Sequence, residues 1–466
     1  MKNTFRNIRT LAALLIASAA ITACTNEDSG IIDNAQPAQQ QGPQVYTLNI
    51  SASKGGDATT RALDLEGTKL VASWTDGDEL GVINLTKSYT ALGGTLTASN
   101  ASGSTATFSG TLSGTIDVGD QLILNYQEHD YFGSEFKSQD GTLKGTNGAE
   151  KYDVANAIVT VASVDGSGNI TISESAASFT TYTAMLKLTL QDGSNNALNA
   201  TSLSISVDGI GELLTFSSID ADASTANGDG ILYFALPNAE NVANIKLGAT
   251  PSDIDEKKAT LAAATVTFTA TVGGTTYTAT KPGYKFTEGK YYAATLTMVK
   301  VYTLAESTVG MIVGTDGKAY AAADKNNLPS GVTAAGMVAY KSGSNGLVIA
   351  LTDEASMMNW STANGASGAA AHTPAVSGQT WKLPSQDEWK QMFSANGGSD
   401  SSYSGLNTAL AAAGGDSSKL QVDDYYWSST EDDSDYAYRV SLRDGDADWL
   451  SFGKDDDVLV RACLAF

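Results

Sequence analysis

Apolar and polar residues alternate with a period of two over much of the chain between residues 45 and 300. In the first such segment, the apolar positions Tyr46, Leu48 and Ile50 are separated by single polar residues. Similar alternation returns in later segments, at residues 122–126, 186–190, 203–207 and 266–272. An alternating strand buries one face and exposes the other, as strands of antiparallel sheets do. The pattern therefore predicts a mainly β body.

Turn-forming dipeptides fall between these segments, at Asp76-Gly77, Asp165-Gly166, Asp192-Gly193, Asp208-Gly209 and Gly273-Gly274. Asp-Gly and Gly-Gly pairs favour tight hairpin turns. Many short strands joined by such turns are typical of β-sandwiches. Because a domain commonly holds about 100–150 residues, we predict two tandem β-sandwiches, residues 45–175 and 176–300.

The pattern changes after residue 300. Ser385 is predicted to cap a helix, because Glu388 can return the hydrogen bond in a capping box. The buried face of this helix would carry Trp389, Met392 and Phe393. We also predict a helix over residues 404–413 and strands at residues 346–351, 425–428, 437–442 and 459–466. Residues 301–466 are therefore predicted to form a separate α+β domain.

The first residues indicate the cellular compartment. Basic residues precede an apolar stretch, residues 11–21, that is too short to span a bilayer as a mature helix. The stretch leads through Ile-Thr-Ala to Cys24, which resembles a lipobox. We predict that residues 1–23 are a lipoprotein signal peptide and that a diacylglycerol on Cys24 enters outer-membrane lipid. The alternative is an ordinary signal peptide with an accidental cysteine.

Residues 24–44 are polar and rich in Gln and Pro, which predicts a flexible tether. Removal of residues 1–23, which hold three basic and no acidic residues, takes the formal charge from −23 to −26. So acidic a surface repels nucleic acid, and we expect no nucleic-acid partner. With Cys24 acylated, Cys463 has no partner in the chain and no disulfide is expected.

The sequence offers little support for catalysis. The only histidines, His129 and His372, fall in different predicted domains. This argues against a histidine-based triad and a multi-histidine zinc site. We therefore expect no enzymatic activity, with carboxylate-pair carbohydrate chemistry as the remaining alternative.

One acidic cluster is a candidate cation site. Asp444, Asp446 and Asp448 alternate, so a strand would direct their carboxylates to one side. Calcium takes about six to eight oxygen ligands, but Trp449 stands where an EF-hand loop needs glycine. A solvated acidic loop is therefore the first interpretation and no cofactor is expected, with calcium at these three residues as the alternative.

The run Trp74-Thr-Asp-Gly-Asp-Glu-Leu-Gly-Val-Ile83, on a lipoprotein with two β-sandwiches, resembles the fimbrillin family of Bacteroidetes pilins. The resemblance covers about residues 45–300 and implies tandem transthyretin-like sandwiches. The pair Glu27-Asp28 also resembles the acidic export signal of surface-exposed lipoproteins from these bacteria.

The same resemblance implies proteolytic trimming. Thr59-Thr-Arg-Ala-Leu63 matches the family's arginine-specific cleavage site in position and type, so cutting would fall between Arg61 and Ala62. The cut would release the first strand and expose a sheet edge, which a strand from another pilin subunit then fills. The alternative is that Arg61 is an ordinary loop arginine.

The last part of the chain resembles the Lcl-type C-terminal domain, which has a C-type-lectin-like fold and occurs in surface adhesins. Three motifs carry the resemblance: residues 381–389, residues 426–431 and residues 460–466. Family members often have a second cysteine that pairs with the one on the last strand. This chain lacks it, so we predict that Cys463 is a buried thiol. We predict that the aromatic residues Trp381, Trp389, Trp427 and Phe466 belong to the core.

Together the resemblances imply a pilus subunit at the surface of the outer membrane, with a lectin-like domain that binds a host or bacterial surface glycan or protein. Because the chain ends inside that domain at Phe466 and offers no spare donor strand, a tip-like adhesin is expected rather than a stalk subunit. The alternatives are a stand-alone surface lipoprotein that binds a glycan or matrix protein, and a carbohydrate-active lipoprotein.

Overall fold

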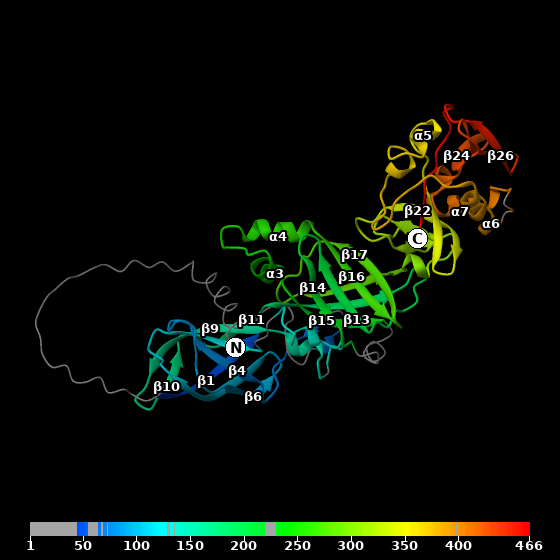
Figure 1. Cartoon of the computed structure of the whole chain (residues 1–466). Helices are drawn as coiled ribbons and strands as arrows, with labels where there is room; N and C mark the ends of the chain where they lie inside the picture. Colours follow the sequence, from blue (N-terminus) through cyan, green and yellow to red (C-terminus); the bar gives the residue numbers. More distant parts are fainter. Residues whose placement is uncertain are drawn as a thin grey trace, which may run out of the picture. The chain divides into compact units, whose positions relative to one another are not determined.

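The structure of the protein is a computed structural model, which describes residues 44–54, 64–66, 69–71, 73–127, 131–134, 136–144, 146–219, 230–397, 399 and 401–466 (Figure 1). These residues form two compact units. The first contains the described residues up to 191, with 197–268 and 281–296, and the second contains 192–196, 269–280 and 297–466. Strands predominate over helices, so the prediction of a mainly β chain is confirmed. No helix within the described ranges is long and apolar enough to cross a membrane.

The first sheet closes on itself. Its strands are β1 (Gln44–Lys54), β4 (Glu79–Asn84), β5 (Thr90–Ala91), β6 (Leu96–Ser102), β7 (Thr105–Gly114), β8 (Gln121–Tyr126), β9 (Ala155–Val164), β10 (Asn169–Ile172) and β11 (Ala177–Thr181). The order is β10-β1-β11-β9-β8-β4-β6-β7, and a further pairing between β1 and β7 completes the circuit. Two short strands, β2 (Asp64–Glu66) and β3 (Lys69–Val71), pair with each other. The first sheet thus continues through residue 181, beyond the boundary predicted at residue 175.

An aromatic cluster forms part of the core inside this closed sheet. Trp74 is 3% exposed and meets the rings of Phe108, Tyr126 and Phe179 edge-on, at centroid distances of 4.8, 5.2 and 5.1 Å. Edge-to-face pairs add about 0.5–1.5 kcal/mol each beyond the burial of their surface. The tryptophan that opens the family-like run is therefore a core residue.

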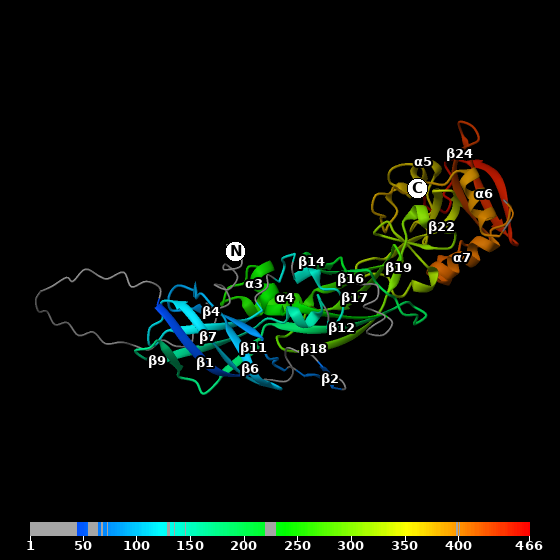
Figure 2. The same ribbon diagram turned by 90° about the horizontal axis from the view of Figure 1, so that it is seen from below.

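The segment of residues 183–301, which contributes to both units, contains helices as well as strands. Its strands are β12 (Thr183–Gln191), β13 (Ser202–Val207), β14 (Gly211–Phe216), β15 (Ile231–Pro237), β16 (Thr265–Val272), β17 (Thr275–Pro282), β18 (Tyr291–Thr297) and β19 (Val299–Val301). They form a three-stranded sheet, β15-β12-β18, and a five-stranded sheet, β14-β13-β16-β17-β19. The helices α3 (Ala239–Lys246) and α4 (Ile254–Ala263) lie beside each other in Figures 1 and 2.

The two helices are a correction to the sequence prediction, which placed only strands here. Asn238 caps α3 by accepting a hydrogen bond from the Asn241 amide at 2.7 Å. In α4, only Leu261 is fully buried, so no apolar stripe of helical period marks that segment. The start signal of α3 is visible in the sequence, whereas α4 has almost none.

The terminal part of the second unit is α+β. Its strands are β20 (Ile312–Gly314), β21 (Ala319–Tyr320), β22 (Ala334–Ser342), β23 (Asn345–Ala350), β24 (Asp424–Glu431), β25 (Tyr436–Arg443), β26 (Asp446–Gly453) and β27 (Cys463–Ala465). They form the sheets β21-β20-β22-β23-β27 and β24-β25-β26. The helices are α5 (Trp360–Ala363), α6 (Gln386–Ala395) and α7 (Ser404–Gly414). Trp381, Trp389 and Trp427 are at most 3% exposed, which confirms them as core residues, and Phe466 is half-buried against the same core.

Local signals predicted the two longer helices correctly. Ser385 and Glu388 form the expected capping box at the start of α6. Gly415, with φ of +91°, ends α7 in a backbone conformation that other residues rarely adopt. The last strand differs from the prediction, because only Cys463–Ala465 pairs continuously with β23, and Val458 and Leu459 form single bridges instead.

A buried ion pair ties the end of the chain to this core. Arg461 is 1% exposed, and its Nε donates to Asp353 Oδ1 at 2.5 Å. Its Nη1 donates to the carbonyl oxygens of Ala350 at 2.9 Å and Ser418 at 3.2 Å, and its Nη2 donates to that of Lys419 at 3.2 Å. A buried charge is tolerated only when partners replace its water, and here each partner is fixed by the fold.

We expect the substitution Arg461→Ala to destabilise the terminal part of the second unit by about 3–5 kcal/mol, because it leaves the Asp353 carboxylate without its cation. Five of the six tryptophans lie in this part, so the denaturant dependence of tryptophan fluorescence reports on it. The control Arg443→Ala removes a guanidinium that is 65% exposed and should change stability by less than about 0.5 kcal/mol. Equal effects of the two substitutions would contradict this account of the core.

Candidate functional site

Strand β1 is paired along both edges. On one side, residues 44–53 run antiparallel to β7 in an unbroken register, from Gln44 opposite Gly114 to Ser53 opposite Thr105. On the other side, β1 runs parallel to β10 at residues 47–48 and to β11 at residues 52–54. This first described strand is therefore an interior strand of the sheet.

The side chains of β1 alternate between core and solvent, as the sequence predicts. Tyr46, Leu48, Ile50 and Ala52 are between 0 and 3% exposed. Residues 47, 49 and 51, which lie between them, are exposed. Full burial of one large aliphatic side chain contributes roughly 1.5–3 kcal/mol, so this strand supplies a considerable part of the core.

The side chains that pack beside the inward face of β1 differ in size along the strand. Tyr46 lies opposite Leu112, and its hydroxyl accepts from the Ile116 amide at 3.4 Å. At the other end, Ala52 lies between Ala106 of β7 and Ala177 of β11. The groove that holds β1 is therefore lined by larger side chains at one end and by alanines at the other.

Loss of β1 would open two strand edges at once. The ladder with β7 would lose its partner along its length, and the apolar face of the groove would be exposed to water. Unpaired edges beside an apolar groove bind extended segments, because main-chain hydrogen bonds give affinity and alternate side chains give specificity. Chemically, the site is thus suited to accept one extended peptide strand.

The residues predicted for processing lie outside the described residues. Arg61 and Ala62 fall in the segment between β1 and β2, and Cys24 precedes β1. Their predicted roles in cleavage and lipidation therefore stay predictions. The order along the chain still matters, because the segment that follows β1 is the one that contains Arg61.

The acidic cluster is only partly on a strand. Asp446 and Asp448 lie on the exposed face of β26, opposite Arg443 and Ser441. Asp444 lies in the turn before β26, with φ of +54°. Across the described part of the chain, no three His, Cys, Asp or Glu side chains are grouped so that they could hold a metal ion.

Two further residues singled out from the sequence are buried in the second unit. His372 is 4% exposed, and its Nδ1 lies 2.7 Å from Glu354 Oε1. Cys463 is fully buried, as predicted, and burial raises the pKa of its thiol. Thiols react as thiolates, so this cysteine is poorly suited to nucleophilic chemistry. His129 lies outside the described residues.

The sequence did not reveal a stacked arginine in the sheet β24-β25-β26. The guanidinium carbon of Arg439 lies 3.7 Å from the ring centre of Tyr425 and 3.2 Å from that of Phe452. Each residue belongs to a different strand. Only the pairing register brings them together, so no local motif could have identified the stack.

Comparison with known protein families and with curated proteins gives no match. Among solved structures, a fimbrial protein from Bacteroides ovatus is similar at 14% identity and a TM-score of 0.26, over 91% of this chain and 100% of that one. A candidate cell adhesion protein from the same species is similar at 15% identity and a TM-score of 0.29, over 56% and 96%. The tip fimbrial protein Mfa3 from Porphyromonas gingivalis is similar at 10% identity and a TM-score of 0.25, over 55% and 95%. These scores are too low for the similarities to establish a shared fold or function.

We expect Leu48→Asp to open the first sheet, because a carboxylate in the core costs more than about 4 kcal/mol. Hydrogen exchange measured by mass spectrometry should show faster exchange of the β7 and β11 amides. The matched control Asn49→Asp adds the same charge to the solvent face of the same strand and should leave exchange unchanged. Unchanged exchange in Leu48→Asp would mean that β1 does not hold the sheet closed.

Proposed function

We propose that this chain is a cell-surface fimbrial subunit that joins a neighbouring subunit by strand addition and presents a ligand-binding domain in residues 301–466. Before assembly, an acyl group on Cys24 and the tether that follows hold the subunit at the outer membrane. A diacylglycerol carries two acyl chains, and two chains anchor a protein stably in a membrane. Cleavage after Arg61 would remove the covalent link between this anchor and the rest of the chain.

The observation that carries this proposal is the position of β1. It is paired on both edges, it fills an apolar groove, and the segment with Arg61 is the chain's only covalent link from β1 to the rest of the sheet. Cleavage after Arg61 would leave β1 held by non-covalent contacts alone. A strand held in that way can exchange with another strand of the same pattern.

The groove defines the chemistry of the incoming strand. Its side chains must alternate, with apolar residues at the positions of Tyr46, Leu48 and Ile50 and a small residue at that of Ala52. Its outward residues face water and are free to vary. A strand of another pilin subunit with this pattern is the partner we propose.

The domain of residues 301–466 is proposed to bind a surface glycan or protein. Two buried clusters supply its core, so it can support recognition without a disulfide. The Lcl-type resemblance supports this role.

Cleavage can be tested on the native surface form. In cells that carry the wild-type chain, we expect mass spectrometry of the assembled protein to find an N-terminus at Ala62. The variant Arg61→Ala should stay as a monomer with acylated Cys24. The control Lys54→Ala alters another basic residue before the same segment and should be processed normally. Wild-type chains that polymerise with Cys24 retained would contradict the proposal, and chains that never polymerise would favour the stand-alone lipoprotein.

Strand exchange can be tested separately with a fluorescent peptide of residues 44–54. We expect this peptide to bind the full chain after cleavage at Arg61 and gentle warming, and not to bind the uncleaved chain. A peptide with Leu48→Asp should lose binding at least about a hundredfold, because its carboxylate would enter the core. A peptide with Asn49→Asp should bind like the wild type. Equal binding of the two altered peptides would exclude the groove as the docking site.

A further inference from the structure

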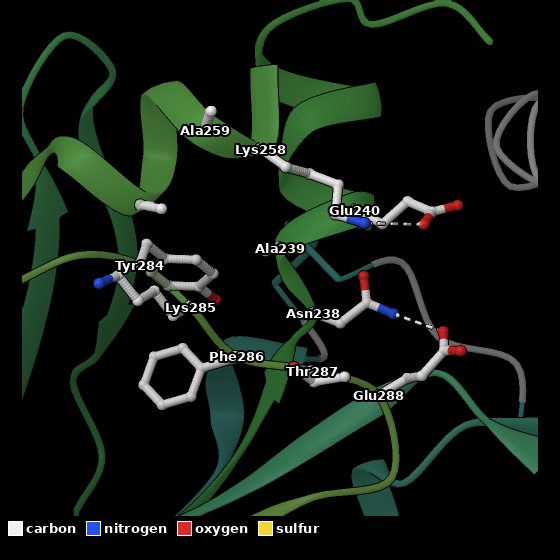
Figure 3. Close-up of a pocket in the computed structure, with 11 residues that line it drawn as sticks. Asn238, Ala239, Glu240, Lys258, Ala259, Tyr284, Lys285, Phe286, Thr287 and Glu288 are labelled. Atoms are coloured by element: carbon white, nitrogen blue, oxygen red, sulfur yellow. Dashed lines mark hydrogen bonds and ion pairs between the residues drawn. The ribbon is translucent and has the colours of Figure 1, made fainter. Parts of the chain in front are cut away.

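A cavity of about 390 Å³ lies in the first unit, well separated in sequence from β1. The start of α3, one side of α4 and the segment between β17 and β18 enclose it (Figure 3). The volume is within the range of small-molecule sites, about 300–1,000 Å³. Neither the strand exchange nor the domain of residues 301–466 uses this cavity.

One wall of the cavity is aromatic. Figure 3 shows Tyr284 and Phe286 on the side away from Glu288. Tyr284 is fully buried, and its hydroxyl donates to the Pro237 carbonyl oxygen at 2.7 Å. The ring of Phe286 is half-buried and meets the rings of Tyr284 and Tyr292 edge-on, at 4.9 and 5.0 Å. These contacts fix an apolar surface that water covers only in part.

The opposite wall is polar. Asn238 is 3% exposed, and its Nδ2 donates to Glu288 Oε2 at 3.2 Å. Its Oδ1 accepts from the Asn241 amide at 2.7 Å, so both ends of the amide are fixed. Lys258 Nζ lies 3.7 Å from Glu240 Oε2, across the space between the two helices (Figure 3). This wall offers donors and acceptors at defined positions.

Backbone hydrogen bonds hold the two walls together. The Ala239 amide donates to the Phe286 carbonyl oxygen at 2.7 Å, and the Tyr284 amide donates to that of Leu261 at 2.8 Å. The segment that carries Tyr284, Phe286 and Glu288 is thus tied to the start of α3 and to the end of α4. A cavity with fixed walls is pre-organised, which lowers the entropy cost of binding.

The charges of the lining balance. Glu240 and Glu288 are matched by Lys258 and Lys285, so the cavity has no net formal charge. Two carboxylates, those of Glu240 and Glu288, line the cavity and would repel a negatively charged ligand. A neutral ligand that has one apolar face and many hydroxyl groups suits an aromatic wall opposite amide, carboxylate and ammonium groups.

We propose that this cavity is a second recognition site, which binds one unit of a neutral saccharide. The C–H face of the sugar packs on Phe286, and its hydroxyls donate to Glu288 and Glu240 and accept from Lys258. The site is independent of strand exchange, so either proposal can fail while the other stands.

The test uses the full chain and saturation-transfer NMR with glucose, galactose, mannose, fucose, N-acetylglucosamine, N-acetylgalactosamine and lactose as probes. We expect at least one to bind the wild type. Glu288→Gln, which keeps the shape but weakens an acceptor, should reduce its affinity about tenfold or more. Phe286→Ala should abolish binding. Glu256→Gln, on an exposed part of α4 outside the lining, should bind like the wild type.

Several results would overturn the proposal. One is that no probe binds the wild type. Another is that binding is unchanged in both Glu288→Gln and Phe286→Ala. Tighter binding of glucuronate or of N-acetyl-lysine amide than of every neutral sugar would also overturn it, because the ligand would then be charged. Far-ultraviolet circular dichroism of each variant separates a lost contact from a lost fold, and Glu288→Gln decides the question if Phe286→Ala does not fold.

Discussion

The first sheet depends on one strand that completes its circuit of main-chain hydrogen bonds. Without β1, the edges of β7 and of β10 and β11 would both be unpaired, and the apolar interior between them would face water. Backbone N–H and C=O groups in a core need hydrogen-bond partners. Each group that is left unpaired there costs a free energy comparable to that of a lost hydrogen bond. Under the proposed strand exchange, the same constraint would favour an extended segment, because any replacement for β1 must satisfy the same ladder.

The two proposed sites would use two kinds of chemistry. The groove of β1 would select for main-chain direction and for alternating apolar side chains, a pattern that many sequences can share. The cavity beside α3 and α4 presents side chains fixed by their own hydrogen bonds, such as Asn238 between Glu288 and the Asn241 amide. The first chemistry suits assembly from repeated subunits, and the second suits discrimination among small ligands.

Local patterns predicted the elements whose signals lie within a few residues. Alternation identified β1, and the pair Ser385 and Glu388 identified α6. Contacts that depend on pairing register or on packing of distant segments were not predictable in this way. The stack of Arg439 on two rings and the cavity beside α4 are both of this kind, because strands or helices far apart in sequence supply their parts. Helix α4 shows the limit most clearly, since half of its residues are exposed and only Leu261 is fully buried.

The alanine-lined end of the groove restricts the orientation in which a strand can occupy it. Ala52 is 2% exposed between Ala106 and Ala177, so an aromatic ring at this position would overlap atoms that already fill the space. A strand inserted backwards would place its bulky end there. If subunits join by the proposed strand addition, steric exclusion at this end would give every subunit of the fimbria the same orientation.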